Sequence, residues 1–369
     1  QISVYWPLFR NTVSAETGLR GTLKTGSIKH SWSVAASGLQ TTNGIVTTNL
    51  ALTPTNMYNP TYIQPVNISA LRNAGSVPKT GESSLSGVAL ADTLGFLDDT
   101  VQLMLGVRQQ NVDAKSFSAT TGVQAGPSAS KGTVTYATGL TVKPMKNLSV
   151  YGNYIEGLQQ GPVAPTSATN GGTVFSPFVS KQYEAGIKYD FGSFLTTLSA
   201  YQITTPNSYT TPANLFVVDG EQKTKGVEIN TYGELVRGIR LLGGVAFINA
   251  RQTKTVNGTN NGKKVTGAAD VQANLGAEWD PGFVQGLTFS SRAIYTSKQY
   301  VDAVNLQAVP SWIRYDAGVR YKTAFSGHPT VFRFNVENIA NKSYWAEATQ
   351  GYVIQSRPRT FVLSASVDL

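Results

Sequence analysis

Apolar and polar residues alternate along much of the chain with a period of two. The end of the chain shows this most clearly, with an apolar row of Phe361, Leu363, Ala365, Val367 and Leu369 separated by polar or small residues. The same alternation appears in residues 183–191, 271–280, 313–321 and 332–337. A period of two predicts β-strands with one apolar and one polar face.

The alternating segments are long enough to cross a bilayer, since a tilted transmembrane strand needs about 9–11 residues. Their apolar rows combine small and aliphatic residues with aromatic ends, and Tyr189, Phe191, Trp279 and Tyr321 stand just before short turns. A soluble β-sandwich also alternates, but its buried rows are mostly large and aliphatic. Aromatic girdles are typical of membrane barrels, so we expect the apolar rows to face lipid and the polar rows to face a lumen.

The connections between these segments alternate in length. Short turns are predicted near residues 25–26, 98–99, 144–145, 191–192, 234–238, 280–282 and 325–329. Longer polar connections are predicted at 41–83, 113–130, 158–177, 204–222, 252–267, 301–310 and 341–357. Short turns on one side and long loops on the other are typical of outer-membrane barrels. The sequence therefore predicts an all-β, antiparallel transmembrane β-barrel.

Counting back from the end gives roughly fifteen strands, with an additional short strand near residues 2–8. An antiparallel single-chain barrel has an even number of strands and both ends in the periplasm. We therefore expect residues 1–369 to begin partway through a barrel, with its first strands outside this sequence. The alternative is a misread strand near the start.

Composition excludes several classes of protein. The sequence has no run of about 18 apolar residues, so no transmembrane helix is expected. Residues 1–3 do not have the pattern of a signal peptide, which is expected if the signal has been removed or if the sequence begins inside a longer protein. There is no cysteine, which excludes disulfides and thiol chemistry. The two histidines, His30 and His328, limit catalytic triads and zinc sites.

The net charge of +9 indicates an anionic partner, unless balancing acidic residues lie outside this sequence. Nucleic acid is not expected, because the basic residues are spread singly. Arg251, Lys254, Lys263 and Lys264 gather around one predicted loop. They could bind lipopolysaccharide phosphates or be solvated.

Catalytic chemistry is not expected. Glu184 with Asp190, and Glu278 with Asp280, are carboxylate pairs on inward rows. They are better explained as partners of inward arginines than as a hydrolytic pair. Both histidines lie beside short turns, away from where a Ser-His site would open.

Several segments resemble TonB-dependent siderophore receptors. Residues 331–345 read VFRFNVENIANKSYW and are followed by Arg357-Pro358-Arg359 and the final strand, which is similar to the end of that family. SKQYEAGIKYD at 180–190 and GEQKTKGVE at 220–228 resemble two further family strands. YGNYIEGL at 151–158 and PSWIRYD at 310–316 fit the same order. These motifs are most similar to those of the hydroxamate branch, such as ferrioxamine and ferrichrome receptors.

The resemblance implies a barrel of about 22 strands filled by a plug domain. On that basis residues 1–369 are the C-terminal part of the barrel, and the plug, the TonB-contacting box and the first strands are outside this sequence. One departure is Leu369, where the family usually ends in an aromatic residue. The resemblance also implies that the inward basic residues contact the plug or guide an anionic ligand along the lumen. These residues are Arg108, Lys188, Arg240, Arg292, Arg314, Arg320 and Arg333.

The expected function is uptake of a ferric siderophore through the bacterial outer membrane, energised through TonB. The siderophore itself would ligate the iron, so no protein metal site and no cofactor are expected. Aromatic and polar residues near the extracellular mouth are the candidate ligand contacts. They are Tyr5, Trp6, Tyr58, Tyr154, Gln159, Phe175, Phe178, Tyr209, Phe216, Tyr300, Trp345 and Tyr352. The alternatives are a passive porin, in which the chain closes as about sixteen strands, and an adhesin without transport.

Overall fold

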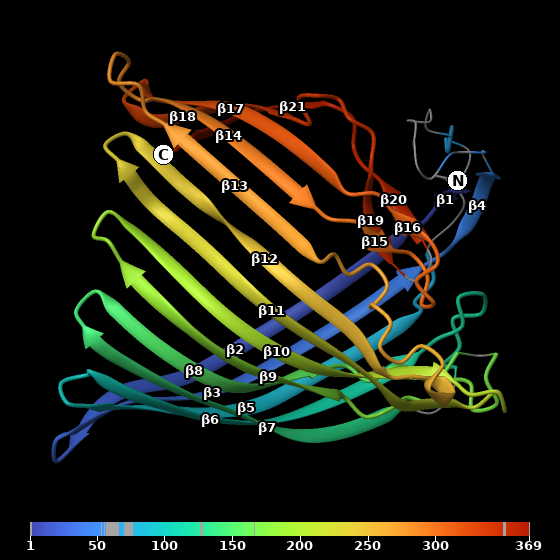
Figure 1. Ribbon diagram of the computed structural model, residues 1–369. Helices are drawn as coiled ribbons and strands as arrows, with labels where there is room; N and C mark the ends of the chain where they lie inside the picture. Colours follow the sequence, from blue (N-terminus) through green and yellow to red (C-terminus); the bar gives the residue numbers. More distant parts are fainter. Residues whose placement is uncertain are drawn as a thin grey trace.

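The computed structural model describes all residues except 1, 53, 55, 57–65, 70–76, 126–127, 166, 350–351 and 369. Its main element is one antiparallel sheet of 15 strands in the order β2-β3-β5-β6-β7-β8-β9-β10-β11-β12-β13-β14-β17-β18-β21. Each strand pairs with the one that precedes it in the sheet and along the chain, so the sheet is a meander. The sheet curls around a hollow interior, with β2 and β3 behind β10 to β13 (Figure 1). The predicted all-β barrel wall and its strand number are confirmed.

The strands of the main sheet have the following bounds. They are β2 (Leu8–Thr25), β3 (Ile28–Ile45), β5 (Gly81–Phe96), β6 (Val101–Ser116), β7 (Ala129–Met145), β8 (Leu148–Gln159), β9 (Phe178–Asp190), β10 (Phe194–Thr210), β11 (Phe216–Val236), β12 (Ile239–Lys254), β13 (Val271–Trp279), β14 (Leu287–Thr296), β17 (Trp312–Phe325), β18 (His328–Glu337) and β21 (Thr360–Val367). Three two-stranded sheets lie in the connections: β1 (Ile2–Tyr5) with β4 (Thr48–Leu52), β15 (Gln299–Tyr300) with β16 (Ala308–Val309), and β19 (Trp345–Thr349) with β20 (Tyr352–Gln355). A single 3-10 turn, η1, spans Val256–Gly258.

The short turns gather at one end of the sheet and the longer connections at the other (Figure 1). All seven predicted turns join paired strands. The short strand expected near residues 2–8 is β1, which pairs with β4 outside the main sheet.

One predicted loop is wrong. Residues 204–222 are mostly paired strand, because β10 continues to Thr210 and β11 begins at Phe216. Asn207 still lies opposite Gly220, and a bulge follows before Tyr209 pairs with Val217. This hairpin carries polar residues on both faces, so the alternation that identified the other strands is missing there.

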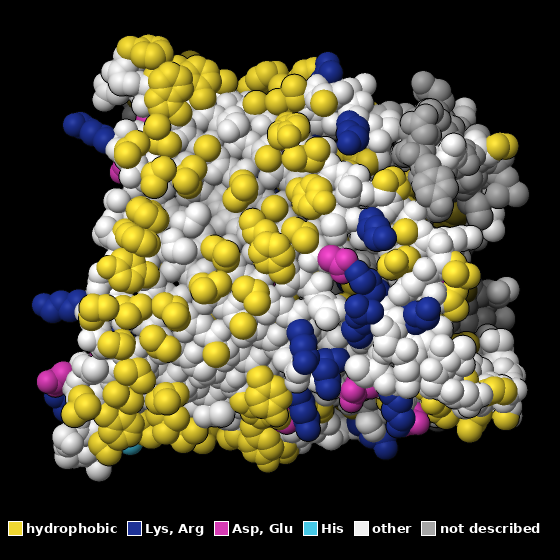
Figure 2. All heavy atoms as spheres, viewed as in Figure 1, with side chains coloured by type: hydrophobic (Ala, Val, Ile, Leu, Met, Phe, Trp, Pro, Cys, Tyr) yellow, Lys and Arg dark blue, Asp and Glu magenta, His cyan; other side chains and the backbone are white. Residues whose placement is uncertain are grey.

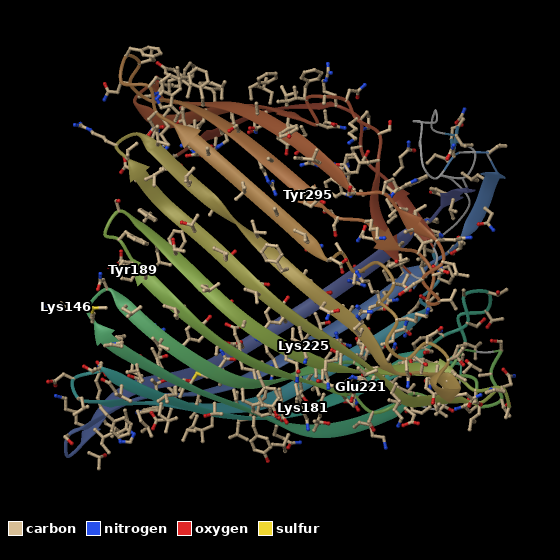
Figure 3. All side chains as sticks on the ribbon, viewed as in Figure 1. Lys146, Lys181, Tyr189, Glu221, Lys225 and Tyr295 are labelled. Carbon is tan, nitrogen blue, oxygen red and sulfur yellow. The ribbon has the colours of Figure 1, made fainter. Side chains whose placement is uncertain are left out.

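The two faces of the sheet differ as the alternation predicts. Tyr183, Ile187, Val227 and Ile229 lie on one face with 41–54% of their surface exposed. Figure 2 shows hydrophobic side chains spread over this outer face, and Figure 3 labels Tyr189 and Tyr295 on it. The opposite, concave face carries the polar rows. Exposed aliphatic and aromatic side chains on a convex face fit a wall that meets lipid.

In the part of the chain that the structure describes, no helix is both long and apolar enough to span a bilayer.

The two outer strands of the sheet, β2 and β21, each have one hydrogen-bonded neighbour in the sheet order. The described residues therefore form an open wall, without the closure that a sixteen-stranded porin requires. An unpaired strand edge in lipid costs several kcal/mol per backbone group, so these edges require further strands as partners.

Candidate functional site: the concave face and the long loops

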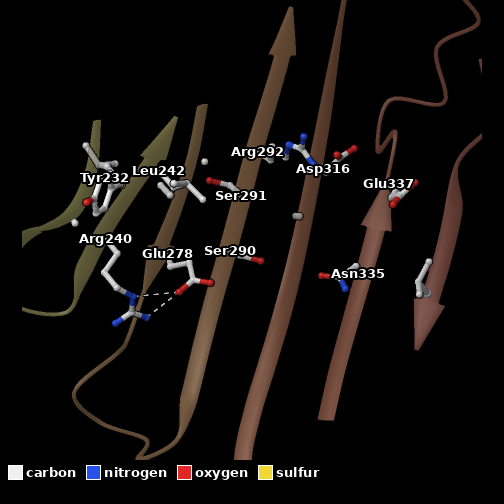
Figure 4. A pocket seen from close by; sticks show the side chains of 16 residues that line it. Tyr232, Arg240, Leu242, Glu278, Ser290, Ser291, Arg292, Asp316, Asn335 and Glu337 are labelled. Carbon is white, nitrogen blue, oxygen red and sulfur yellow. Dashed lines mark hydrogen bonds and ion pairs between the residues drawn. The ribbon is translucent and has the colours of Figure 1, made fainter. Parts of the chain in front are cut away.

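A hollow of about 660 Å³ lies on the concave face between β11 and β21. Polar residues from successive strands line it, and Figure 4 labels Arg240, Glu278, Ser290, Arg292, Asp316, Asn335 and Glu337. They gather on one face because each strand contributes alternate residues in matched register, such as Glu278 opposite Ser290 and Arg292 opposite Asp316. The predicted inward rows therefore meet on one face, where apolar side chains such as Leu242 and Val362 lie among the polar ones.

A charge network connects this hollow to the short-turn end. Arg240 donates from Nη2 to Glu278 Oε2 at 2.9 Å and from Nη1 to Asp280 Oδ2 at 2.6 Å. Arg320 donates to both oxygens of Glu278, at 3.2 and 3.1 Å. Thr288 donates to Asp280 Oδ1 at 2.7 Å. Because Asp280 lies in the turn after β13 and accepts from Arg240 and Thr288, its pKa falls to about 2.

The expected pairing of inward carboxylates with arginines is confirmed for Glu278 and Asp280 and wrong for the other pair. Glu184 accepts from the Tyr151 hydroxyl at 2.7 Å and from Gln182 at 3.0 Å. Asp190 accepts from the backbone N–H of Gly192 in its own turn. The described residues contain no group of three or more His, Asp or Glu placed to hold a metal ion.

Two tyrosine rings lie against glycines on the concave face. Tyr151 is opposite Gly186, and Tyr201 is opposite Gly226. A Cβ atom built on either glycine would approach the ring to within 2.7 or 2.5 Å, so only glycine accommodates the rings in this position. Sequence reasoning overlooked both tyrosines. The alternation could have identified them, because each tyrosine stands an even number of residues from polar residues of its strand that lie on the inward face.

Four of the other inward basic residues have local partners. Arg292 donates to Asn274 at 2.8 Å, Arg314 to Asp316 at 2.8 Å, and Arg333 to Ser366 at 3.1 Å. Lys188 lies 5.1 Å above the Tyr151 ring. Of these four residues, Arg314 alone forms an ion pair in the described part of the chain, and the partners of the other three are neutral.

Several candidate ligand contacts lie at the end of the sheet that carries the long connections. Gln159 ends β8 opposite Phe178 at the start of β9. Phe175 and Phe216 pack edge to face at 5.6 Å in a small core with Ala164 and Ala168. The Tyr209 hydroxyl is 3.5 Å from Asp219 Oδ2.

The remaining candidates are more scattered. Tyr5 ends β1, and Trp6 follows it with 59% of its surface exposed. The Tyr300 ring lies 5.4 Å from Lys298 Nζ. Tyr352 of β20 pairs through its backbone with Thr349 of β19. Tyr58 lies outside the described residues.

Two candidates do not face the open space on the concave side of the sheet. Tyr154 is opposite Tyr183, with ring centroids 5.0 Å apart, and therefore lies on the outer face. Trp345 is only 3% exposed and packs with Val301 and Val309 from a neighbouring loop. In this arrangement Tyr154 is a wall residue and Trp345 fixes the loops against one another.

The four basic residues expected around one loop differ in their partners. Lys254 forms an ion pair with Asp219, and Lys264 forms one with Asp270. Arg251 donates to Asn249 and to the Gly262 carbonyl, and Lys263 is exposed.

A curled antiparallel meander with an apolar convex face, a polar concave face and one end of long loops defines a β-barrel protein of the bacterial outer membrane. The family model described as "TonB dependent receptor-like, beta-barrel" matches residues 4–339. The chain belongs to this family, and the resemblance in its motifs is confirmed.

Individual relatives agree with the family assignment. The ferrichrome receptor FcuA of Yersinia enterocolitica is 34% identical over 99% of this chain and 49% of its own length. The ferrioxamine B receptor of Salmonella typhimurium is 25% identical over 96% of this chain and 50% of its own length. The solved ferric preacinetobactin receptor BauA of Acinetobacter baumannii superposes with a TM-score of 0.79 at 37% identity, covering 99% of this chain and 55% of that one. The chain spans about half the length of the curated relatives it matches.

Proposed function

We propose that this chain forms part of the barrel of a receptor that takes up a ferric siderophore through the outer membrane, with energy supplied through TonB. The observation that carries the proposal is the family match over residues 4–339. The relatives named above support it, since they are receptors for ferrichrome, ferrioxamine B and ferric preacinetobactin. Two of these three names denote hydroxamate siderophores, so a hydroxamate is the ligand to test first.

The geometry suits capture at the loops followed by passage along the polar wall. Arg240, Glu278, Asp280 and Arg320 satisfy one another, so this part of the wall offers hydrogen bonds without a large excess of either charge. A bulky complex is therefore not retained by a single strong electrostatic contact. The inward arginines then serve mainly to position the wall and a plug, with guidance of the ligand as a secondary role.

The ferric ion is cargo in this proposal. The siderophore supplies its ligands, and the protein needs neither a metal site nor a cofactor. The protein is a receptor and carries out no covalent chemistry on its cargo. A passive porin is not favoured, because the described sheet is open and the family consists of TonB-dependent receptors.

Growth of the source bacterium on single siderophores tests the function. A strain deleted for the gene, starved of iron, should fail to grow on one ferric hydroxamate and should be rescued by the intact gene. Rescue should disappear when TonB is also deleted. Rescue that persists without TonB would overturn the proposal in favour of passive diffusion.

The ligand contacts are tested in the same strain. Gln159→Ala and Tyr209→Ala, at the long-loop end, should raise the siderophore concentration needed for half-maximal uptake. Tyr154→Phe, on the outer face, is the matched control and should leave it unchanged. Equal effects from all three variants would argue against a binding role for the loop-end pair.

A further inference from the structure

The outer face carries an acidic side chain near its short-turn end. Asp92 of β5 lies opposite Trp32 of β3 on one side and opposite Leu105 of β6 on the other. Leu105 is 46% exposed, and Leu90, which shares the parity of Asp92 along β5, is 51% exposed. The alternation therefore places Asp92 on the face that meets lipid. Ionisable residues at membrane depth are costly, and they usually mark a functional site.

Asp92 stands at the level of the membrane interface. It precedes the end of β5 at Phe96 by four residues, so it lies about 10 Å from the short turn at a strand tilt near 40°. Trp32 on the same rung supports this level, because tryptophan gathers where lipid headgroups meet the apolar layer. The short turns, at the left in Figure 1, face the periplasm in such barrels. Asp92 is therefore close to the headgroups of the periplasmic leaflet.

The Asp92 carboxylate is held in place but is not fully satisfied. His30 Nδ1 lies 2.7 Å from Asp92 Oδ2. Asp92 Oδ1 is buried and has no hydrogen-bond partner within the described part of the chain. Apart from His30, the outer-face neighbours on the two adjacent rungs are apolar, namely Val34, Leu90, Leu94, Leu103 and Val107. A carboxylate oxygen without a donor is unfavourable in such surroundings, and a donor brought by a ligand would remove that cost.

The carboxylate remains within reach of a ligand that approaches from the lipid side. The Asp92 side chain is 32% exposed. The Trp32 ring lies over Gly21 of β2, on the side of β3 away from Asp92, and so does not cover it. The torsion that turns an aspartate carboxylate is soft, so a small rotation presents either oxygen to a donor.

An apolar hollow of about 390 Å³ begins at Asp92 and crosses β6 and β7 on the outer face. The outward side chains that line it are Leu90, Asp92, Leu105, Val107, Tyr136 and Thr138. It leads from the rung of Asp92 to the rung of Leu90, which is farther from the short turn. An acyl chain in the hollow would therefore point toward the bilayer midplane, as the chains of a periplasmic-leaflet lipid do.

We propose that Asp92 and this hollow form a binding site for a phospholipid whose headgroup ends in a primary ammonium. The ammonium donates to the Asp92 carboxylate, one acyl chain lies along the hollow, and His30 positions the carboxylate. A primary ammonium offers three N–H donors, whereas a quaternary ammonium offers none. An anionic headgroup is repelled by the carboxylate. The site goes beyond the proposed uptake, because Asp92 does not face the lumen.

Native mass spectrometry of the intact detergent-solubilised protein, titrated separately with phosphatidylethanolamine and phosphatidylglycerol of the same acyl chains, tests the site. Asp92→Asn keeps the shape of the side chain and removes its charge. It should weaken binding of phosphatidylethanolamine by about fivefold, the size expected of one charge pair near a membrane surface, and should not weaken binding of phosphatidylglycerol. Thr138→Trp fills the hollow and should weaken binding of both lipids.

Asp113→Asn is the matched control, because it removes an exposed carboxylate from the same outer face at the long-loop end. It should bind both lipids as the unmodified protein does. Unchanged binding of phosphatidylethanolamine in Asp92→Asn, an equal loss for phosphatidylglycerol or for phosphatidylcholine, or an equal loss in the control would overturn the site. A dimer that Asp92→Asn abolishes while lipid binding stays constant would instead assign this surface to a second copy of the chain.

Discussion

Placing an arginine on one or the other face of β11 tests which face meets lipid. Ile229 and Asn230 are adjacent, and the alternation puts Ile229 on the outer face and Asn230 on the concave face. From Lys225 to Leu235 the strand rises about 25 Å at a tilt near 40°, which matches the height of an apolar band. Ile229 therefore lies within about 3 Å of the bilayer midplane on the same estimate.

The expected cost follows from this depth. Arginine on the lipid face at the midplane destabilises a barrel by about 2–4 kcal/mol. Ile229→Arg should lower the free energy of unfolding by that amount. Asn230→Arg should change it by less than about 1 kcal/mol, because its side chain is exposed on the polar face.

Denaturant titration of the intact protein in lipid vesicles, followed by tryptophan fluorescence, measures both variants. Equal destabilisation, or a larger loss for Asn230→Arg, would refute the assignment of the faces. Repeating the pair in detergent micelles is a useful control, since the difference should shrink where the apolar layer adapts to the charge.

Three further predictions concern the charge network and the loops. Glu278→Gln should destabilise the barrel by about 1–2 kcal/mol, because Arg240 and Arg320 both lose a charged acceptor that is about one-third exposed; a double-mutant cycle with Arg240→Gln should show coupling, and additive effects would contradict the network. The pKa of Asp280 is held near 2, below its usual 3.8, so the stability it contributes is present above pH 3.8 and is lost as the pH falls toward 2. In a plot of the denaturation midpoint against pH, Asp280→Asn should therefore reduce the slope between pH 2 and pH 3.8. A slope equal to that of the unmodified protein would contradict this assignment. Trp345→Ala removes a side chain that is 3% exposed, at a typical local cost of about 3–5 kcal/mol; proteolysis of the surrounding loops should accelerate while the unfolding midpoint of the sheet stays constant.

Local pattern was sufficient for the wall. The period of two that places Ile187 and Lys188 on opposite faces is a property of consecutive residues. Turns are also local, since they contain glycines such as Gly26 and Gly192, which adopt positive φ values. Faces, strand number and turns could therefore be predicted without knowing which strands touch.

Features that depend on register could not be predicted in the same way. Arg240 meets Glu278 and Asp280 only because β12 and β13 pair in one particular alignment. The long hairpin of β10 and β11 leaves the apolar band and is wetted on both faces, so its polar sequence resembles that of a loop. The burial of Trp345 requires two separate connections to meet, which no short pattern records.

The glycines opposite Tyr151 and Tyr201 affect the width of the passage. Because Gly186 and Gly226 have no side chain, the two rings lie flat against the backbone and the clearance in front of them is kept. A methyl group at either glycine would tilt the ring away from the wall and toward the axis. If the proposed uptake holds, these two glycines leave more room in front of the wall at that level than any larger residue would.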